Sequence, residues 1–328
     1  MKRFLSVLIP VFALIVAGCG GKTQETGSAT RVTVAHVPST LFAPLYVAQA
    51  KGYFAEEGID VDLQTIKAGQ DAVPLAAAGK VDVVVAGFSA GLFNAVHSGL
   101  SLKVVGSMGI ATGDPKASPT ALEVSKKLVD AGEVRSVTDL RGRKVAVSGG
   151  PAAAGGYQLA TVLAQSGLSL RDVQIVNIAI PDQRTALANG GVDAALAPAP
   201  FTTKMEQAGV AVPLAVPADG TSATGVIFGG RFAESDAAQP FFHALQRASR
   251  DLQGAAATSP ENLTILAKAT GQDLAVLESV PSYRWRPDLS PDTAQLTAQQ
   301  QIYRDAGLLD YTDLIPADTY VSTTFSGT

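Results

Sequence analysis

The chain has 328 residues, and its 25 basic and 29 acidic side chains give a formal net charge of −4 at pH 7. Apolar residues make up 47% of the sequence and charged residues 16%, which supports a buried core and excludes a disordered chain. At about 100–200 residues per domain, the length predicts two domains. A mildly acidic chain without a basic run lacks the electrostatic features of a nucleic-acid-binding protein, so that class is excluded.

The N-terminus has the layout of a secretory signal peptide. Lys2 and Arg3 are followed by an apolar stretch, residues 4–18, which ends at the single cysteine, Cys19. This stretch is shorter than the roughly 20 residues that a membrane-spanning helix needs. A basic start, a short apolar run and small residues at its end are typical of a signal peptide, which we predict over residues 1–18.

Residues 16–19 (VAGC) resemble the lipobox of bacterial lipoproteins, in which cleavage precedes the cysteine and the thiol is acylated. The resemblance implies lipidation of Cys19, which anchors a protein stably when several acyl chains are attached. The alternative is an ordinary signal peptide with an incidental cysteine. Residues 19–30 have the composition of a flexible tether, so we expect an extracytoplasmic protein anchored to the membrane.

From residue 31 onward, short β-rich runs alternate with helical patterns, which predicts an α/β fold with mostly parallel strands. The first series has predicted strands at 31–36, 59–66, 81–86 and 103–106, with helices beginning near 43, 71 and 91. The second series has predicted strands at 144–148, 173–178, 192–196 and 210–215, with a helical turn at 137–140 and helices at 156–165, 183–188 and 202–207. The tail is predicted helical, with amphipathic spacing at 232–252, 260–269 and 291–306.

One sequence pattern occurs twice. Residues 77–82 (AAGKVD) recur as 188–193 (ANGGVD), and each copy ends a predicted helix with glycine and opens an apolar strand with Val-Asp. The alternative reading is that helix-to-strand joints are alike because glycine caps helices and valine begins strands. The repeat favours two similar α/β lobes. Because open parallel sheets bind ligands outside the carboxyl ends of their strands, we expect one cleft between the lobes.

Several short segments follow one another in a characteristic order. They are FAPLYVA (42–48), KGYFAEEGIDV (51–61), LVDAGEV (128–134), DLRGRKVAV (139–147), ALANGGVD (186–193) and the pair Pro200-Phe201. Together they resemble periplasmic solute-binding proteins of the nitrate, sulfonate and taurine type, a group that includes the thiamine-precursor binders. The resemblance runs from about residue 31 to 215, and more loosely through the helical tail.

This resemblance implies a type II periplasmic-binding-protein fold. Two lobes joined by two crossovers close on a small-molecule ligand, and an ABC permease with its ATPase receives that ligand. The resemblance assigns residues 31–113 and 222–328 to the first lobe and 114–221 to the second. We expect a monomer that uses no cofactor and is no enzyme. A lipid anchor agrees with this role, because it keeps the receptor near its transporter.

Loops at four predicted strand ends are the candidate ligand-binding segments. The candidate residues in them are Ser39, Thr40, Phe42, Phe88, Ser89, Ser148, Gly149, Gly155, Tyr157, Pro200 and Phe201. Loop 148–157 is rich in glycine just before a helix, so its backbone N–H groups can face an anion. It matches neither the Walker motif nor the dinucleotide fingerprint. The alternative is a flexible loop with helix-capping residues.

The composition of these loops limits the ligand chemistry. None of them contains Arg, Lys, Asp or Glu, so an anionic ligand would depend on hydroxyls and helix N-termini, with Arg184 or Lys204 nearby. Four aromatic residues lie in the loops, which suits an apolar or ring-bearing ligand. The alternative is that each ring fills the core beneath its loop. We expect a small organic ligand, either sulfonate-like or neutral and aromatic.

Residues 87–91 (GFSAG) match the nucleophile elbow G-x-S-x-G, so a secreted serine esterase using Ser89 is an alternative function. The triad needs a histidine on a loop after the acid, yet His36 precedes the serine, His97 lies on the same predicted helix and His243 lies in another. We therefore expect Ser89 to contact the ligand or to cap a helix. The histidine spacing predicts no metal site. A ligand-sensing lipoprotein without a transporter is a third possibility.

Overall fold

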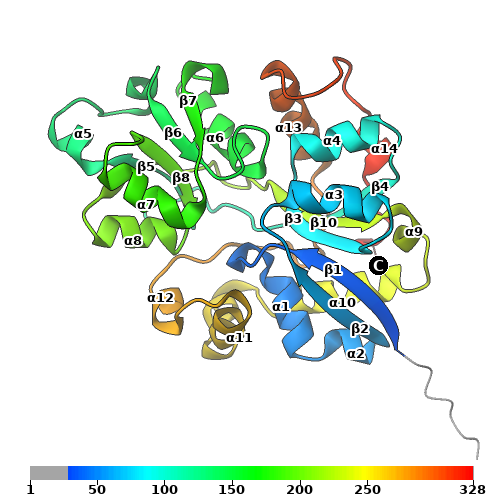
Figure 1. Cartoon of the computed structure of the whole chain (residues 1–328). Coiled ribbons are helices and arrows are strands. Elements are labelled where there is room, and N and C mark those ends of the chain that lie inside the picture. Colours follow the sequence, from blue (N-terminus) through cyan, green and yellow to red (C-terminus); the bar gives the residue numbers. More distant parts are fainter. Residues whose placement is uncertain (1–28, 328) are drawn as a thin grey trace, which may run out of the picture.

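The computed structural model describes residues 29–327, so the predicted signal peptide and Cys19 lie outside the described residues. Two five-stranded sheets occur in the described part of the chain (Figure 1). The strands of the first sheet are β1 (Thr30–His36), β2 (Ile59–Thr65), β3 (Val83–Gly87), β4 (Leu102–Met108) and β10 (Thr224–Gly229). The strands of the second sheet are β5 (Thr120–Ser125), β6 (Lys144–Val147), β7 (Gln174–Asn177), β8 (Ala194–Pro198) and β9 (Ala211–Ala215). We call the parts of the chain built on these two sheets lobe 1 and lobe 2.

Both sheets have the same topology. Their strand orders are β2-β1-β3-β10-β4 and β7-β6-β8-β5-β9. In each, the strand in the fourth position runs antiparallel to both of its neighbours, and the chain enters it after crossing from the other lobe. The repeated sequence pattern precedes equivalent strands, β3 and β8. This equivalence confirms the prediction of two similar α/β lobes.

The strands that directly follow the two crossovers, β5 in lobe 2 and β10 in lobe 1, are not among the strands predicted from the sequence. All six residues of each strand are buried, so neither shows the alternation of apolar and polar residues that marks a strand. Glu123 interrupts the apolar run of β5, and Gly225 lies within β10. Their pairing is decided by partners far away in the sequence, which no local pattern reveals.

The helices cover both faces of the sheets. Lobe 1 has α1 (Ala43–Ala50), α2 (Tyr53–Glu56), α3 (Gly69–Ala77) and α4 (Ala90–His97), and lobe 2 has α5 (Lys126–Asp130), α6 (Ala154–Ala164), α7 (Ile180–Ala188) and α8 (Phe201–Gln207). The tail contains α9 (Gly230–Ala233), α10 (Ala238–Arg250), α11 (Pro260–Thr270), α12 (Leu274–Glu278), α13 (Thr293–Asp305) and α14 (Ala317–Tyr320). Short 3-10 turns occupy Thr40–Phe42, Val137–Leu140, Leu170–Asp172 and Gly254–Thr258. The predicted helix over 232–252 is two helices, because the Ser235 hydroxyl donates to the Phe232 carbonyl oxygen and closes a turn between α9 and α10.

Aromatic residues of the tail complete the core of lobe 1. Phe228 in β10 makes edge contacts with Phe241 and Phe242 of α10, and Phe54 of α2 stacks on Phe241 with ring centroids 4.9 Å apart. Such pairs contribute about 0.5–1.5 kcal/mol each beyond the area that they bury. The tail is therefore an integral part of lobe 1. No helix of residues 29–327 is both long and apolar enough to cross a membrane.

Candidate functional site

A cavity of about 210 Å³ lies between the two lobes. Each of the segments at the ends of β1, β3, β6 and β8, which lie within residues 37–42, 87–89, 148–155 and 198–201, contributes some of its residues to the lining. These are the carboxyl ends of parallel strands in both sheets, where a sheet leaves its backbone and side chains free to meet a ligand. The expected cleft between the lobes is thus present.

Seven of the candidate ligand residues line this cavity. They are Ser39, Phe42, Ser89, Ser148, Gly149, Gly155 and Phe201. Thr40, Phe88, Tyr157 and Pro200 are not part of the lining. The side chains of Phe88 and Tyr157 are buried in the hydrophobic cluster of lobe 1. Phe88 therefore fills the core beneath its own loop, which was the alternative reading, whereas Tyr157 of lobe 2 packs into the core of the other lobe.

Other lining residues come from segments that the sequence did not single out. Lys67 lies in the loop between β2 and α3, and Gln70 lies in the first turn of α3, so the rule that selected the other loops also applies to them. Thr120 begins the unpredicted strand β5. Gln272 and Tyr283 belong to the tail, and no local signal marks them.

The cavity has a positive electrostatic character. Lys67 is the one charged residue in the described lining, and no carboxylate is part of it. The residues at the N-cap positions of α3, α4 and α6, namely Ala68, Ser89 and Ala153, also line the cavity. Helix N-termini carry a partial positive charge and free N–H groups. Arg184 and Lys204, expected near an anionic ligand, are not part of the lining.

The remaining wall is largely apolar. Leu41, Phe42, Ile180, Leu196 and Phe201 contribute to it from both lobes. The tail closes the wall with Tyr283, whose hydroxyl donates to the Pro119 carbonyl oxygen at 3.0 Å and lies 2.8 Å from Thr120 Oγ1. Burial raises the pKa of Tyr283, so this phenol stays protonated. The cavity combines one cation with an apolar surface.

Ser89 occupies a helix cap. Its Oγ accepts a hydrogen bond from the Leu92 N–H at 3.4 Å. All three histidines have other partners, because His36 Nδ1 lies 3.0 Å from Tyr46 Oη, His97 stacks on Tyr311 and His243 Nδ1 lies 2.7 Å from Glu57 Oε1. The geometry gives Ser89 the capping role expected for it, and the arrangement of an esterase triad is not formed by these histidines.

A loop of lobe 2 rests directly on lobe 1. The Ala90 N–H at the start of α4 donates to the Ala152 carbonyl oxygen at 2.9 Å. A Cβ at Gly87 would lie 2.6 Å from Ala154 Cβ, so only glycine permits this approach of the lobes. Tyr157 inserts its ring into the hydrophobic cluster of lobe 1. The lobes are therefore in contact along one side of the cavity.

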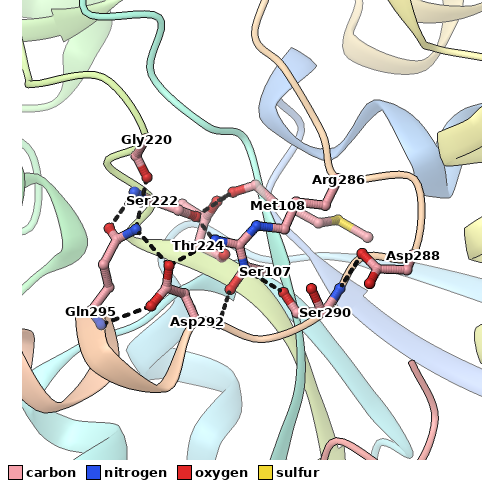
Figure 2. Close-up of polar contacts among 10 residues, drawn as sticks. All are labelled: Ser107, Met108, Gly220, Ser222, Thr224, Arg286, Asp288, Ser290, Asp292 and Gln295. Atoms are coloured by element: carbon pink, nitrogen blue, oxygen red, sulfur yellow. Dashed lines mark hydrogen bonds and ion pairs between the residues drawn. The ribbon is translucent and has the colours of Figure 1, made fainter. Parts of the chain in front are cut away.

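The tail also fastens the two crossover segments to each other (Figure 2). The Gln295 amide accepts from the Ser222 N–H and donates to the Gly220 carbonyl oxygen, both at 2.7 Å. Ser222 Oγ in turn donates to the Met108 carbonyl oxygen at 3.0 Å, which joins the second crossover to the first. Arg286 pairs with Asp292 at 2.8 Å and holds the segment between α12 and α13 in place. These bonds hold together the segments that connect the lobes, and we call this region the hinge region.

Comparisons with known proteins agree with this architecture. A family model described as NMT1/THI5 like matches residues 39–262. A Haemophilus influenzae protein named for thiamine biosynthesis is 35% identical over 141 residues, which are 42% of this chain and 39% of that protein. YtlA of Bacillus subtilis, named as a binding protein, is 39% identical over 84 residues, which are 25% of this chain and 23% of that protein. The match thus spans less than half of the length of either curated relative.

Solved structures resemble almost the whole chain. The alkanesulfonate-binding protein SsuA from Xanthomonas axonopodis pv. citri, bound to MOPS, has a TM-score of 0.66 and 21% identity, with 89% of this chain and 99% of that chain covered. The periplasmic nitrate-binding protein NrtA from Synechocystis PCC 6803 has a TM-score of 0.74 and 12% identity, with 90% of this chain and 87% of that chain covered. At such identities the likeness shows the fold. It confirms the predicted periplasmic-binding-protein architecture.

Proposed function

The chain belongs to the NMT1/THI5-like family, and from this premise we propose that it is an extracytoplasmic solute-binding protein that captures a small organic anion for an ABC permease. The observation that carries the proposal is the cavity between the lobes, which has Lys67 as its one charged residue in the described lining. A sulfonate or a similar anionic group would face Lys67 and the N-termini of α3, α4 and α6. Its apolar body would contact the walls around Phe42 and Phe201.

To capture a ligand, the two lobes must move from an open to a closed arrangement. Both lobes line the cavity, so a ligand that contacts both is bound more tightly in the closed arrangement than in an open one. Only such a difference in affinity can shift the equilibrium towards closure. The permease then distinguishes the closed pair of lobes from the open pair.

A thermal-shift titration tests the ligand class. Alkane- and arylsulfonates should raise the melting temperature, since a ligand at 100 times its dissociation constant adds about 2.7 kcal/mol of stability. Lys67→Gln should weaken sulfonate binding roughly 10-fold or more, because a hydrogen bond to a charged group contributes about 1.5–3 kcal/mol. Lys80→Gln, an exposed lysine outside the cavity lining, is the control and should bind like the wild type. Equal binding by wild type and Lys67→Gln would contradict an anion site at Lys67.

The alternatives have their own tests. Stoichiometric labelling of Ser89 by an organophosphorus probe would show that the protein is a serine esterase and would contradict the proposed solute-binding function. Sulfonate uptake by vesicles that contain the permease and its ATPase, dependent on this protein, would exclude a sensor without a transporter. The proposed lipid anchor rests on the sequence, and Cys19→Ser should move the protein from the membrane fraction to the soluble fraction.

A further inference from the structure

A buried pair of side chains, His36 and Tyr46, lies directly behind one wall of the cavity. His36 is the last residue of β1, Tyr46 lies on α1, and between them is the loop Val37–Ser39, which we call the wall loop. The two residues are 5% and 2% exposed. Nδ1 of His36 lies 3.0 Å from the hydroxyl oxygen of Tyr46, and the rings pack edge to face. Neither residue is part of the described lining, so both act on the cavity through the loop.

The hydroxyl group of Tyr46 binds the wall loop at both of its ends. It donates to the Val37 carbonyl oxygen at 3.2 Å and accepts from the Ser39 N–H at 3.4 Å. Pro38, between them, has no N–H and adds no backbone donor. All three loop residues line the cavity. The shape of this part of the wall therefore depends on a phenol group that does not itself reach the cavity.

His36 determines where the single phenol proton goes. A tyrosine hydroxyl has one proton, and here the Val37 carbonyl oxygen receives it. The contact with His36 therefore needs a proton on Nδ1, so that the imidazole donates to the Tyr46 oxygen. Burial lowers the pKa of His36 and raises the pKa of Tyr46 to about 12, so both groups are neutral near pH 7. His36 thus donates to Tyr46, and Tyr46 donates to the loop.

The cationic end of the cavity is held in a different way. Lys67 follows Ile66, whose N–H donates to the backbone carbonyl oxygen of His36 at 2.9 Å. This bond continues the pairing of β1 with β2 and involves neither ring. The wall loop instead adjoins Leu41 and Phe42, which belong to the apolar part of the lining. A change in the ring pair should therefore alter the apolar wall and leave Lys67 in place.

We propose that His36 and Tyr46 are positioning residues that hold the wall loop against the apolar body of a bound ligand. The proposal rests on the proposed function and adds that the preference for an apolar body is controlled from behind the cavity wall. In Tyr46→Phe the ring stays in the core, but the loop loses one donor and one acceptor. A ligand with an apolar body then meets a less ordered wall and binds more weakly.

Two sulfonates of different size test the proposal by calorimetric titration. 4-Methylbenzenesulfonate has a large apolar body and methanesulfonate has a very small one, while the anionic group is the same. Tyr46→Phe should bind 4-methylbenzenesulfonate about 5-fold more weakly than the wild type, as expected for the loss of about one net hydrogen bond. Methanesulfonate should bind to both proteins within twofold. Unchanged affinity for 4-methylbenzenesulfonate, or an equal loss for both sulfonates, would overturn the proposal.

Tyr320→Phe is the matched control, because Tyr320 is also buried in lobe 1, accepts a hydrogen bond from Gln300 Nε2 and is not part of the described lining. It should bind both sulfonates like the wild type. In the unliganded proteins, hydrogen exchange over residues 37–42 should be faster in Tyr46→Phe than in the wild type or in Tyr320→Phe. Unchanged exchange in Tyr46→Phe would overturn the positioning role. If the wild type binds neither sulfonate, anion capture fails, while the exchange rates still decide the role of Tyr46.

A rescue experiment separates hydrogen bonding from packing at His36. His36→Leu removes the donor, whereas His36→Asn keeps an amide N–H at about the place of Nδ1. His36→Leu should bind 4-methylbenzenesulfonate about 3-fold more weakly than the wild type, and His36→Asn should bind it within about 1.5-fold. An equal loss in both variants would mean that His36 acts through packing alone and would overturn its positioning role.

Discussion

Tyr303 Oη lies 2.9 Å from the carbonyl oxygen of Ala153, a hydrogen bond that joins α13 of the tail to the start of α6 in lobe 2. The same hydroxyl lies 3.2 Å from the Phe88 carbonyl oxygen in lobe 1, which also accepts a hydrogen bond from Gln299 Nε2. A tyrosine has one hydroxyl proton. Gln299 Nε2 already donates to the Phe88 carbonyl oxygen. The single hydroxyl proton of Tyr303 is therefore available for the Ala153 carbonyl oxygen, across the contact between the lobes.

Tyr303→Phe should loosen this contact. The variant keeps the ring in the core but loses two buried hydrogen bonds, the one that Tyr303 donates to Ala153 and the one that it accepts from Gln299 Nε2, so we expect a loss of about 1–3 kcal/mol in the free energy of unfolding. The lobes should separate more often, which small-angle X-ray scattering would detect as a larger radius of gyration. Tyr311→Phe is the matched control, because Tyr311 donates to Gln300 Oε1 within the tail. An unchanged radius in Tyr303→Phe would show that other contacts hold the lobes together.

Glu123 makes the stability of lobe 2 depend on pH. It is fully buried in β5, and burial raises its pKa to about 8, helped by the neighbouring carboxylate of Glu206 on α8. The fold therefore favours the protonated form. The stabilisation that the protonated Glu123 side chain gives to the folded state is complete below pH 4.5, the pKa of this carboxyl in the unfolded chain, and is lost as the pH rises through about 8.

Glu123→Gln should remove this dependence. Between pH 4.5 and 8 the wild type should lose up to about 1.4 kcal/mol of unfolding free energy per pH unit, and the variant should show a flatter profile. Urea denaturation at several pH values measures both profiles. Glu133→Gln changes an exposed glutamate of the same lobe and should follow the wild type. Parallel profiles for wild type and Glu123→Gln would mean that the carboxyl titrates normally.

Phe201 and Phe88 should respond differently to truncation. Phe201 lines the cavity and is partly exposed, so Phe201→Ala should weaken the binding of 4-methylbenzenesulfonate with a modest loss of stability. Phe88 is 1% exposed and lies in the core, so Phe88→Ala should lower the free energy of unfolding by about 3–5 kcal/mol. Calorimetric titration and urea denaturation of both variants provide the comparison. Unchanged affinity in Phe201→Ala would remove this ring from the ligand contacts.

Gln295 should control the rigidity of the hinge. In Gln295→Glu the carboxylate can still accept from the Ser222 N–H, but it cannot donate to the Gly220 carbonyl oxygen, and it adds a negative charge beside Asp292. We expect a loss of about 1–3 kcal/mol near neutral pH. Hydrogen exchange at residues 216–222 should become faster.

Gln301→Glu introduces the same charge at an exposed position of α13 and is the control for the hinge variant. Its exchange rates over residues 216–222 should match those of the wild type. Equal protection of this segment in Gln295→Glu would show that the Gln295 amide does not stabilise the hinge.

The local sequence determined most of the strands and helices that the two lobes have in common. Parallel strands such as β1, β3, β6 and β8 follow from short β-rich runs, and the glycines Gly79 and Gly190 follow the helices that precede β3 and β8. Because strand ends in parallel sheets share one edge, the four loops around the cavity could be identified from the sequence. Lys67 follows β2 in the same way, so the same rule could have found it.

Only the tertiary structure decided which side chains meet in the cavity. β5 and β10 pair with strands far away in the sequence, and their uniform burial leaves no periodic pattern to detect. Gln272 and Tyr283 reach the cavity because the tail packs against both lobes. An aromatic residue after a strand can point into the cleft, as Phe201 does, or into the core, as Phe88 does, and the choice depends on the space that neighbouring elements leave.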